Sequence, residues 1–238
     1  MKLLLTVLLI AMASAAQARW YQVDVVVFRH SSGMTTAGEQ WPELENLPDF
    51  RRSVRLDEDG QRSGEAPQGG PTAFQRLARG ERRLDGAAGR VSGGDYELLL
   101  ADAWRQPSFG VAGAKRVYLS DLSDGSDPAT LVVGPGGVVA AIEPRIEGTV
   151  AIKVARLLHI EVDVLYRHED VVVRLSETRR AKLRETHYFD HPLFGVLVQV
   201  SPFVVPEVAA TDGLDAAYAS VDEATPSVGG AATPAELP

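Results

Sequence analysis

The stretch from residue 147 to residue 166, EGTVAIKVARLLHIEVDVLY, carries the strongest strand pattern in the chain. Val150, Ile152 and Val154 alternate with smaller or polar residues, and the alternation resumes from Leu158 to Tyr166. Apolar side chains at every second position place one face of a strand against a core. These twenty residues exceed an ordinary strand. The segment is therefore either one strand with a bulge near 155–157 or two strands.

Further strands are predicted on both sides of this stretch. Residues 170–186 follow the turn residues 168–170 and should form a hairpin with the preceding strand. Residues 20–29, WYQVDVVVFR, become apolar on both faces towards their end, which is typical of a central strand. The remaining predicted strands span residues 96–106, 117–119 and 194–200.

The sequence predicts one main helix, over residues 72–93. Thr72 is suited to the N-cap and Gly93 with Gly94 to the end of such a helix. Three internal glycines weaken it by up to about 1 kcal/mol each relative to alanine. An apolar stripe at a spacing near 3.5 residues supports it: Phe74, Leu77, Leu84, Ala88 and Val91. Together these elements predict an α+β fold, in which one antiparallel sheet carries one main packed helix and long loops.

We expect a single domain over residues 19–202, with loops at 51–71 and 121–145, where Gly, Pro, Ser and mixed charge gather. Residues 203–238 hold six acidic residues and no Lys or Arg, so we expect a disordered acidic tail. The formal net charge of -8 gives no global field that would attract nucleic acid. The absence of cysteine excludes disulfides and thiolate chemistry.

Residues 1–18 have the composition of a secretory signal peptide. Lys2 gives a short positive region, residues 3–13 are almost all apolar, and residues 16–18 form an A-x-A cleavage site. The apolar run is too short to span a bilayer comfortably. We therefore expect cleavage between Ala18 and Arg19, export to the periplasm, and no membrane span in the mature protein. An uncleaved N-terminal anchor is the alternative.

The even-numbered face of the predicted strand 170–186 carries a candidate binding site. Arg180, Lys182 and Arg184 stand at every second position and form a basic row near Arg174. Side chains at this spacing project from the same face of a strand. Such a row suits anionic or carboxylate-bearing polymers, including those with cell-wall stem peptides. A solvated outer face, or an edge strand protected by charge, accounts for the same residues without a ligand.

His187 and His191 form a second cluster, in which Asp190 adjoins His191. On a helix this spacing would place both imidazoles on one side, where they can hold zinc. Pro192 follows at once, and a helix does not run through that position. We therefore expect a structural corner and no metal. Because the sequence has neither a G-x-S-x-G or S-x-x-K nucleophile motif nor a phosphate loop, it predicts no catalytic residue and no cofactor.

Three stretches of the chain, taken together, carry a family resemblance. They are RWYQVDVVVF (19–28) with EQWP (39–42), residues 147–150 running into 156–159, and HYFDHPLFG (187–195). The last is the most specific and contains His187, Asp190, His191, Pro192 and Gly195. These stretches resemble the CsiV family of periplasmic peptidoglycan-binding proteins, which take part in cell-wall assembly and cell shape. The resemblance covers most of residues 19–202.

This resemblance implies a periplasmic, non-enzymatic protein that binds peptidoglycan and supports peptidoglycan assembly and cell shape. It implies peptidoglycan as the ligand, and an envelope lipoprotein or a regulator of a peptidoglycan synthase as a protein partner. Two other classes stay open, namely an envelope peptidoglycan hydrolase or amidase and a periplasmic adaptor that contacts only proteins. Release of muropeptides would identify the hydrolase, and a failure to bind cell walls would identify the adaptor.

The mature N-terminus is predicted to be Arg19, because Ala16 and Ala18 supply the small side chains that signal peptidase requires. Mass analysis of protein isolated from the periplasm should show the loss of residues 1–18. An intact Met1 would contradict this prediction and favour the N-terminal anchor.

Overall fold

The computed structural model describes only part of the chain. Residues 207–238, which make up most of the predicted acidic tail, lie outside the described residues, as does the predicted signal peptide with Ala18. Within the described part, no helix is long and apolar enough to cross a membrane. The described residues are 19–31, 44, 47–56, 71–122, 131–133, 139–141, 143–168 and 171–206.

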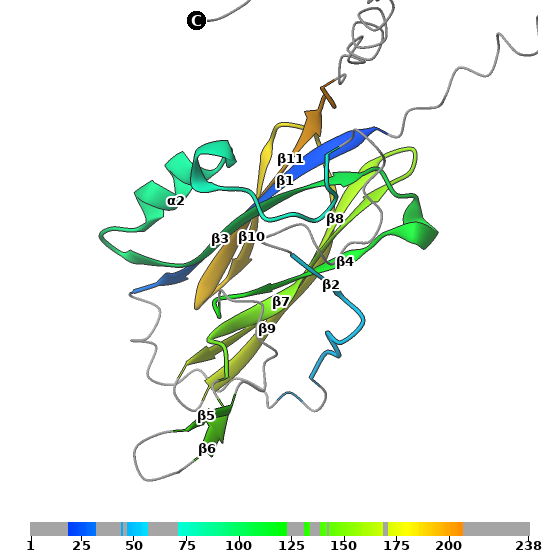
Figure 1. Ribbon diagram of the computed structural model, residues 1–238. Helices are drawn as coiled ribbons and strands as arrows, with labels where there is room; N and C mark the ends of the chain where they lie inside the picture. Colours follow the sequence, from blue (N-terminus) through cyan, green and yellow to red (C-terminus); the bar gives the residue numbers. More distant parts are fainter. Residues whose placement is uncertain are drawn as a thin grey trace, which may run out of the picture. The chain divides into compact units, whose positions relative to one another are not determined.

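Strands make up 57% of the described residues and form two main sheets (Figure 1). Sheet A is antiparallel and has the order β10 (Thr186–His191), β11 (Phe194–Phe203), β1 (Trp20–His30) and β3 (Tyr96–Pro107). Sheet B has the order β2 (Val54–Arg55), β4 (Arg116–Ser120), β7 (Ile146–Val154), β8 (Leu158–His168) and β9 (Val171–Ala181). Its strands are antiparallel except for the pair β2–β4.

The core lies between the two sheets. Alternation along β1 sends Val23, Val25 and Val27 into this core, as it does for the equivalent side chains of β11. Sheet B contributes the apolar positions of β4, β7 and β8, among them Val150 and Ile160. Apolar residues of both sheets thus share one cluster, which is the arrangement of a β-sandwich. The prediction that residues 20–29 form a central strand is confirmed, since β1 pairs with β11 and β3.

The stretch 147–166 is two strands. β7 ends at Val154 and β8 begins at Leu158, and the two pair in antiparallel register from Val154–Leu158 to Ile146–Tyr166. The turn residues Ala155 to Leu157 are exposed, and the Ala155 N–H donates to the Leu157 carbonyl (3.2 Å). β9 pairs with β8 as predicted, but it ends at Ala181 and does not continue to residue 186.

The α+β prediction is wrong, because the expected helix over 72–93 does not form. Only Asp85–Val91 is α-helical (α2), and a 3-10 turn covers Arg79–Glu81 (η2). Upstream, the backbone follows the open edge of β3. The Phe74 N–H donates to the Arg105 carbonyl and the Leu77 N–H to the Ala103 carbonyl, both at 2.8 Å.

Asp102 supplies the physical reason for this difference. It is a buried carboxylate on β3, and Arg76 (3.3 Å) and Arg82 (4.0 Å) both form ion pairs with it. A buried charge needs such partners. The segment before α2 therefore lies as an extended strap along β3.

Helix α2 covers the face of sheet A that points away from sheet B (Figure 1). Leu84 and Ala88 pack there against Val26 and Phe28 of β1. The carboxylate of Asp24, also on this face, accepts the Arg83 backbone N–H (2.6 Å) just before the helix begins. Burial raises the pKa of Asp24 above its usual value, although this hydrogen bond opposes the shift.

A bulge in β3 changes which side chains reach this outer face. Val27 pairs with Leu100 but Phe28 pairs with Leu98, so Leu99 has no partner in the register. One extra residue reverses the alternation of a strand. Leu98 therefore packs with α2 on the outer face, whereas Trp104 lies in the core between the sheets.

Two of the predicted loops contain short strands. Within 121–145 lie β5 (Leu131–Val133) and β6 (Val139–Ala141), which pair with each other as a separate two-stranded sheet. Within 51–71, β2 pairs with β4. Residues 57–70 and 123–130 lie outside the described residues. At the other end of the domain, β11 continues to Phe203, one residue past the expected boundary.

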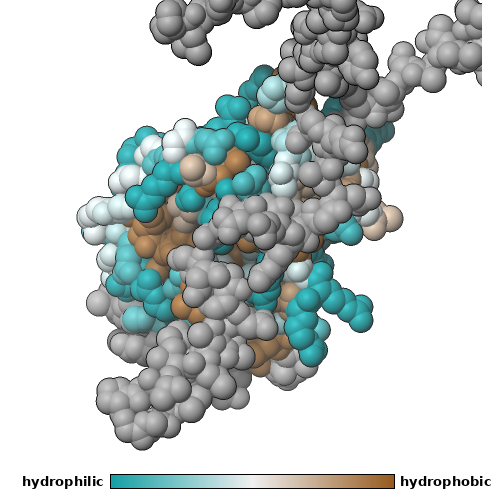
Figure 2. Space-filling model, viewed as in Figure 1, coloured by the Kyte–Doolittle hydropathy of each residue, from teal (hydrophilic) through white to brown (hydrophobic). Residues whose placement is uncertain are grey.

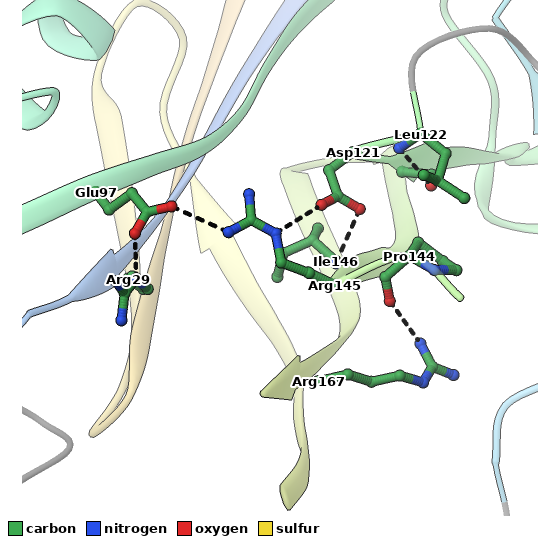
Figure 3. A network of polar contacts seen from close by, with 9 residues as sticks. Arg29, Glu97, Asp121, Leu122, Pro144, Arg145, Ile146 and Arg167 are labelled. Carbon is green, nitrogen blue, oxygen red and sulfur yellow. Dashed lines mark hydrogen bonds and ion pairs between the residues drawn. The ribbon is translucent and has the colours of Figure 1, made fainter. Parts of the chain in front are cut away.

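An ion network joins the two sheets at one end of the sandwich (Figure 3). Glu97 of β3 accepts hydrogen bonds from Arg29 of β1 and from Arg145, which precedes β7 (3.0 Å). Arg145 also pairs with Asp121 (3.2 Å), and Asp121 accepts the Ile146 backbone N–H (3.2 Å). The hydrogen bond from Arg29, followed by that from Arg145, lowers the pKa of Glu97 below its usual value.

Substitution of Glu97 should remove a contribution to stability that depends on pH. A carboxylate with a lowered pKa stabilises the fold above its unfolded pKa, and the contribution is lost as the pH falls through the folded pKa. Glu97→Gln should therefore cost about 1 kcal/mol or less at pH 7, since the pairs are partly exposed. The difference from wild type should shrink below about pH 4 in chemical denaturation.

Asp49→Asn is the matched control, because it removes a carboxylate from an exposed ion pair with Arg51 in a single loop. This variant should unfold almost as wild type does at pH 7. An equal loss in both variants would mean that Glu97 does not link the sheets.

Candidate functional site

Aromatic side chains gather on the outer face of sheet A, next to the cluster through which α2 packs on this sheet, and Phe28 belongs to both groups. We call Phe28, His30, Tyr96, Tyr188 and Asp190 the aromatic platform. Phe28 is buried at its centre, and its ring meets Tyr96 edge to face (5.3 Å between centroids) and Tyr188 in a stacked arrangement (6.1 Å). Tyr96 and Tyr188 keep 42% and 37% of their surface exposed, which leaves aromatic surface open to a ligand.

Strand register brings these residues together from three parts of the chain. Phe28 of β1 lies opposite Gly195 of β11, which in turn lies opposite Asp190 of β10. Two residues further along β1, His30 lies opposite Tyr96 of β3, and their ring centroids are 5.4 Å apart. Because successive side chains alternate between faces, all of these residues point to the same side of the sheet.

Gly195 makes the platform flat at its centre. A Cβ atom at this position would lie 2.5 Å from Cε2 of Tyr188 and 2.8 Å from Cζ of Phe28. Only a residue without a side chain lets the two rings close over β11. The glycine in HYFDHPLFG therefore has a packing role that follows directly from the platform.

The polar groups of the platform are held in fixed positions. The Tyr188 hydroxyl donates a short hydrogen bond to the Asp190 carboxylate and lies 3.5 Å from Nε2 of His30. Burial, followed by the bond to Asp190, raises the pKa of the Tyr188 hydroxyl well above its usual value. The hydroxyl therefore stays protonated at physiological pH and keeps the carboxylate beside the ring.

Exposed aromatic rings with polar groups at their rim suit a ligand that has apolar and hydroxylated surfaces. The face of an aromatic ring carries partial negative charge and attracts the weakly positive C–H groups of a sugar ring. A carboxylate and an imidazole at the edge can hydrogen-bond the hydroxyl or amide groups of the same ligand. The platform can thus bind a saccharide, whereas acid–base hydrolysis would need a second carboxylate across the scissile bond.

HYFDHPLFG is a hairpin. Pro192 and Leu193 form the two-residue turn between β10 and β11. His191 accepts the Leu193 N–H at Nδ1 (3.2 Å), and His187 lies at the other end of β10 against the backbone of Lys182 (3.1 Å). Four residues along a strand span about 13 Å, so the two imidazoles cannot ligate one metal ion. Among the described residues, no group of three or more His, Asp or Glu side chains is placed to hold a metal.

The predicted basic row does not lie along one strand. Arg180 is in β9, but Lys182 follows the end of the strand and pairs with Glu185 (3.2 Å). Arg184 lies in the turn to β10 with a positive φ of 65°, and its N–H donates to the Val200 carbonyl (2.8 Å). The alternation that would align the three side chains therefore stops at Ala181. Arg174, also expected nearby, is engaged by Asp163 (2.7 Å).

Described residues line two surface grooves of similar volume. One, of about 650 Å³, lies between α2 and β3, where Figure 2 shows apolar surface beside the helix. Leu98, Leu100 and Ala88 line it together with Arg79 and other charged residues. The other groove, of about 630 Å³, lies beside β2, β4 and β7 of sheet B and is lined mostly by polar and basic residues.

Sequence reasoning missed the partners of the most specific motif. It singled out His187, Asp190 and His191, but the exposed ring of that motif is Tyr188, and its neighbours Phe28, His30 and Tyr96 come from distant strands. The spacing of Tyr188 and Asp190 was the available signal, since residues two apart on a strand share a face.

Comparison with known proteins gives one family. The family model described as "Peptidoglycan-binding protein, CsiV" matches residues 1–203. No curated protein and no solved structure matches the chain. The matched range includes every residue of the aromatic platform and both sheets.

Gly195→Ala should destabilise the domain by about 1–3 kcal/mol, the usual cost of overpacking, because the buried Phe28 ring cannot move away from a new Cβ atom. Gly110→Ala is the control, since nothing lies within 4 Å of a Cβ atom there. Urea denaturation measures both variants. Equal stability of the two would show that the rings do not close over β11.

Proposed function

The chain belongs to the CsiV family of peptidoglycan-binding proteins, and from this premise we propose that it acts in the periplasm as a non-enzymatic factor. In this proposal it binds the glycan of peptidoglycan through the aromatic platform and so supports peptidoglycan assembly and cell shape. The observation that carries the proposal is the exposed pair of rings, Tyr96 and Tyr188, on either side of the buried Phe28.

The chemistry of the ligand matches this surface. A peptidoglycan strand presents pyranose rings with C–H faces, hydroxyl groups and N-acetyl groups. The C–H faces can stack on Tyr96 and Tyr188, and the polar groups can reach Asp190 and His30 at the rim. The rings are already placed by Phe28 and Gly195, so binding requires little ordering of side chains.

A binding role without catalysis fits the arrangement of charge. The aromatic platform includes one carboxylate, Asp190, and the Tyr188 hydroxyl already donates to it. Glycoside hydrolysis usually needs a pair of carboxylates on opposite sides of the bond that breaks. A platform of this kind can hold a glycan strand while other proteins of the envelope extend or cross-link it.

Tyr96→Ala and Tyr188→Ala should each weaken co-sedimentation with purified sacculi by about 2- to 10-fold, since one aromatic contact contributes about 0.5–1.5 kcal/mol. Leu183→Ala is the control, because Leu183 is similarly exposed (41%) but lies in the turn after β9. Circular dichroism should show all three variants folded. Wild-type affinity in both tyrosine variants would refute the platform as the glycan site.

A further inference from the structure

Basic side chains form a row across the strands of sheet B on its outer face. Lys153 of β7 lies opposite His159 of β8, and His159 lies opposite Arg180 of β9. Directly paired residues project to the same face, and neighbouring strands are about 4.8 Å apart. The three side chains therefore line a track of about 10 Å that runs across the strands, at right angles to the row that sequence alone predicted.

The row continues into the second groove through Lys153, which belongs to both. Arg52, Lys115 and Arg116 also line this groove. We call these residues and the row the basic groove: Arg52, Lys115, Arg116, Lys153, His159 and Arg180. Its five Lys and Arg charges face two nearby carboxylates, Asp49 and Glu161, so the local formal charge is +5 − 2 = +3. The whole chain, in contrast, carries -8.

Glu161 organises one side of the basic groove. It accepts hydrogen bonds from Arg116 (3.0 Å from Nε) and from Lys153. Burial raises the pKa of Glu161, but the hydrogen bonds from Lys153 and Arg116 outweigh burial and lower it overall. Glu161 thus stays ionised and fixes these two cations. With the other described residues, Arg52, Lys115 and Arg180 form no ion pair, and all three are exposed.

We propose that the basic groove binds the carboxylates of peptidoglycan stem peptides. The identity of this ligand rests on the proposed function. Cations held at the spacing of neighbouring strands can meet several carboxylates of one extended peptide. Val111, which is 61% exposed, and Ala114 also line the groove and offer contacts to the alanine methyl groups of a stem. A ligand with both carboxylates and small apolar groups fits this lining better than a phosphate does.

The test compares two triple variants of the full mature chain. Arg52→Ser/Lys115→Ser/Arg180→Ser removes the three groove cations that form no ion pair with another described residue, so Glu161 keeps both of its partners. Arg79→Ser/Arg83→Ser/Arg90→Ser removes the same charge from exposed positions on or beside α2. Circular dichroism checks the fold, and the single variant Arg180→Ser provides a milder change.

Two ligands distinguish binding to the stem peptides from binding to the glycan. One is intact sacculi, and the other is glycan strands from which an amidase has removed the stem peptides. The groove triple variant should bind sacculi about fivefold more weakly than wild type, as expected for several exposed charge contacts, and Arg180→Ser should lose less. Wild-type binding to sacculi should weaken in high salt. The groove variant should bind the stripped glycan as tightly as wild type does. The α2 variant should bind both ligands as tightly as wild type does.

Four results would overturn the inference. The groove variant binds sacculi as tightly as wild type does, or the α2 variant loses as much affinity for sacculi as the groove variant. Alternatively, the groove variant loses as much affinity for stripped glycan as for sacculi, or wild type binds anionic lipid vesicles and the groove variant does not. In each case the wild-type chain would still bind sacculi, so the proposed function would be unaffected. Failure of the wild-type chain to bind sacculi at all would instead refute the proposed function.

Discussion

The rest of the structure depends on the burial of β1 on both faces. Its odd-numbered valines pack between the two sheets, and Val26 and Phe28 pack on the opposite side against α2 and its neighbours. Both edges of the strand also pair with neighbouring strands, one with β11 and the other with β3. Removal of this strand would open the sandwich core, the helix contact and the aromatic platform together. The run VDVVVF, with apolar side chains on both faces, is the local sequence that meets all of these demands.

The sequence predicted the strands well and the fold class badly, and both outcomes have the same cause. Alternation is a local signal, so β1, β3, β4 and the hairpin β8–β9 could be placed from residues alone. The stripe over 72–93 was equally regular, but its first half forms backbone hydrogen bonds to β3 and charge contacts to Asp102. Those partners lie some twenty residues or more away. Tertiary contacts of this kind override helix propensity and cannot be seen in a local pattern.

The candidate sites show the same difference between what a local sequence pattern predicts and what only tertiary contacts determine. The sequence predicted a corner at Pro192 but not the strand β10 before it, and the meeting of Tyr188 with Tyr96 and His30 depends on strand order in sheet A. The sequence placed the basic row on one predicted strand, residues 170–186, but only the register with β8 and β7 shows that Arg180 lies in line with His159 and Lys153. Residue spacing describes one strand. Neither strand order nor register across a sheet can be read from it.

The pairing of β1 with β11 also sets the order in which the chain can fold. Trp20 lies opposite Phe203, so β1 cannot complete its pairing in sheet A until almost the last residues of the described domain are present. Contacts so far apart in sequence form late and slow the folding of a chain. A ribosome-bound chain that does not yet include β11 cannot complete sheet A. Sheet A can therefore close only after nearly the whole of the described domain has been synthesised.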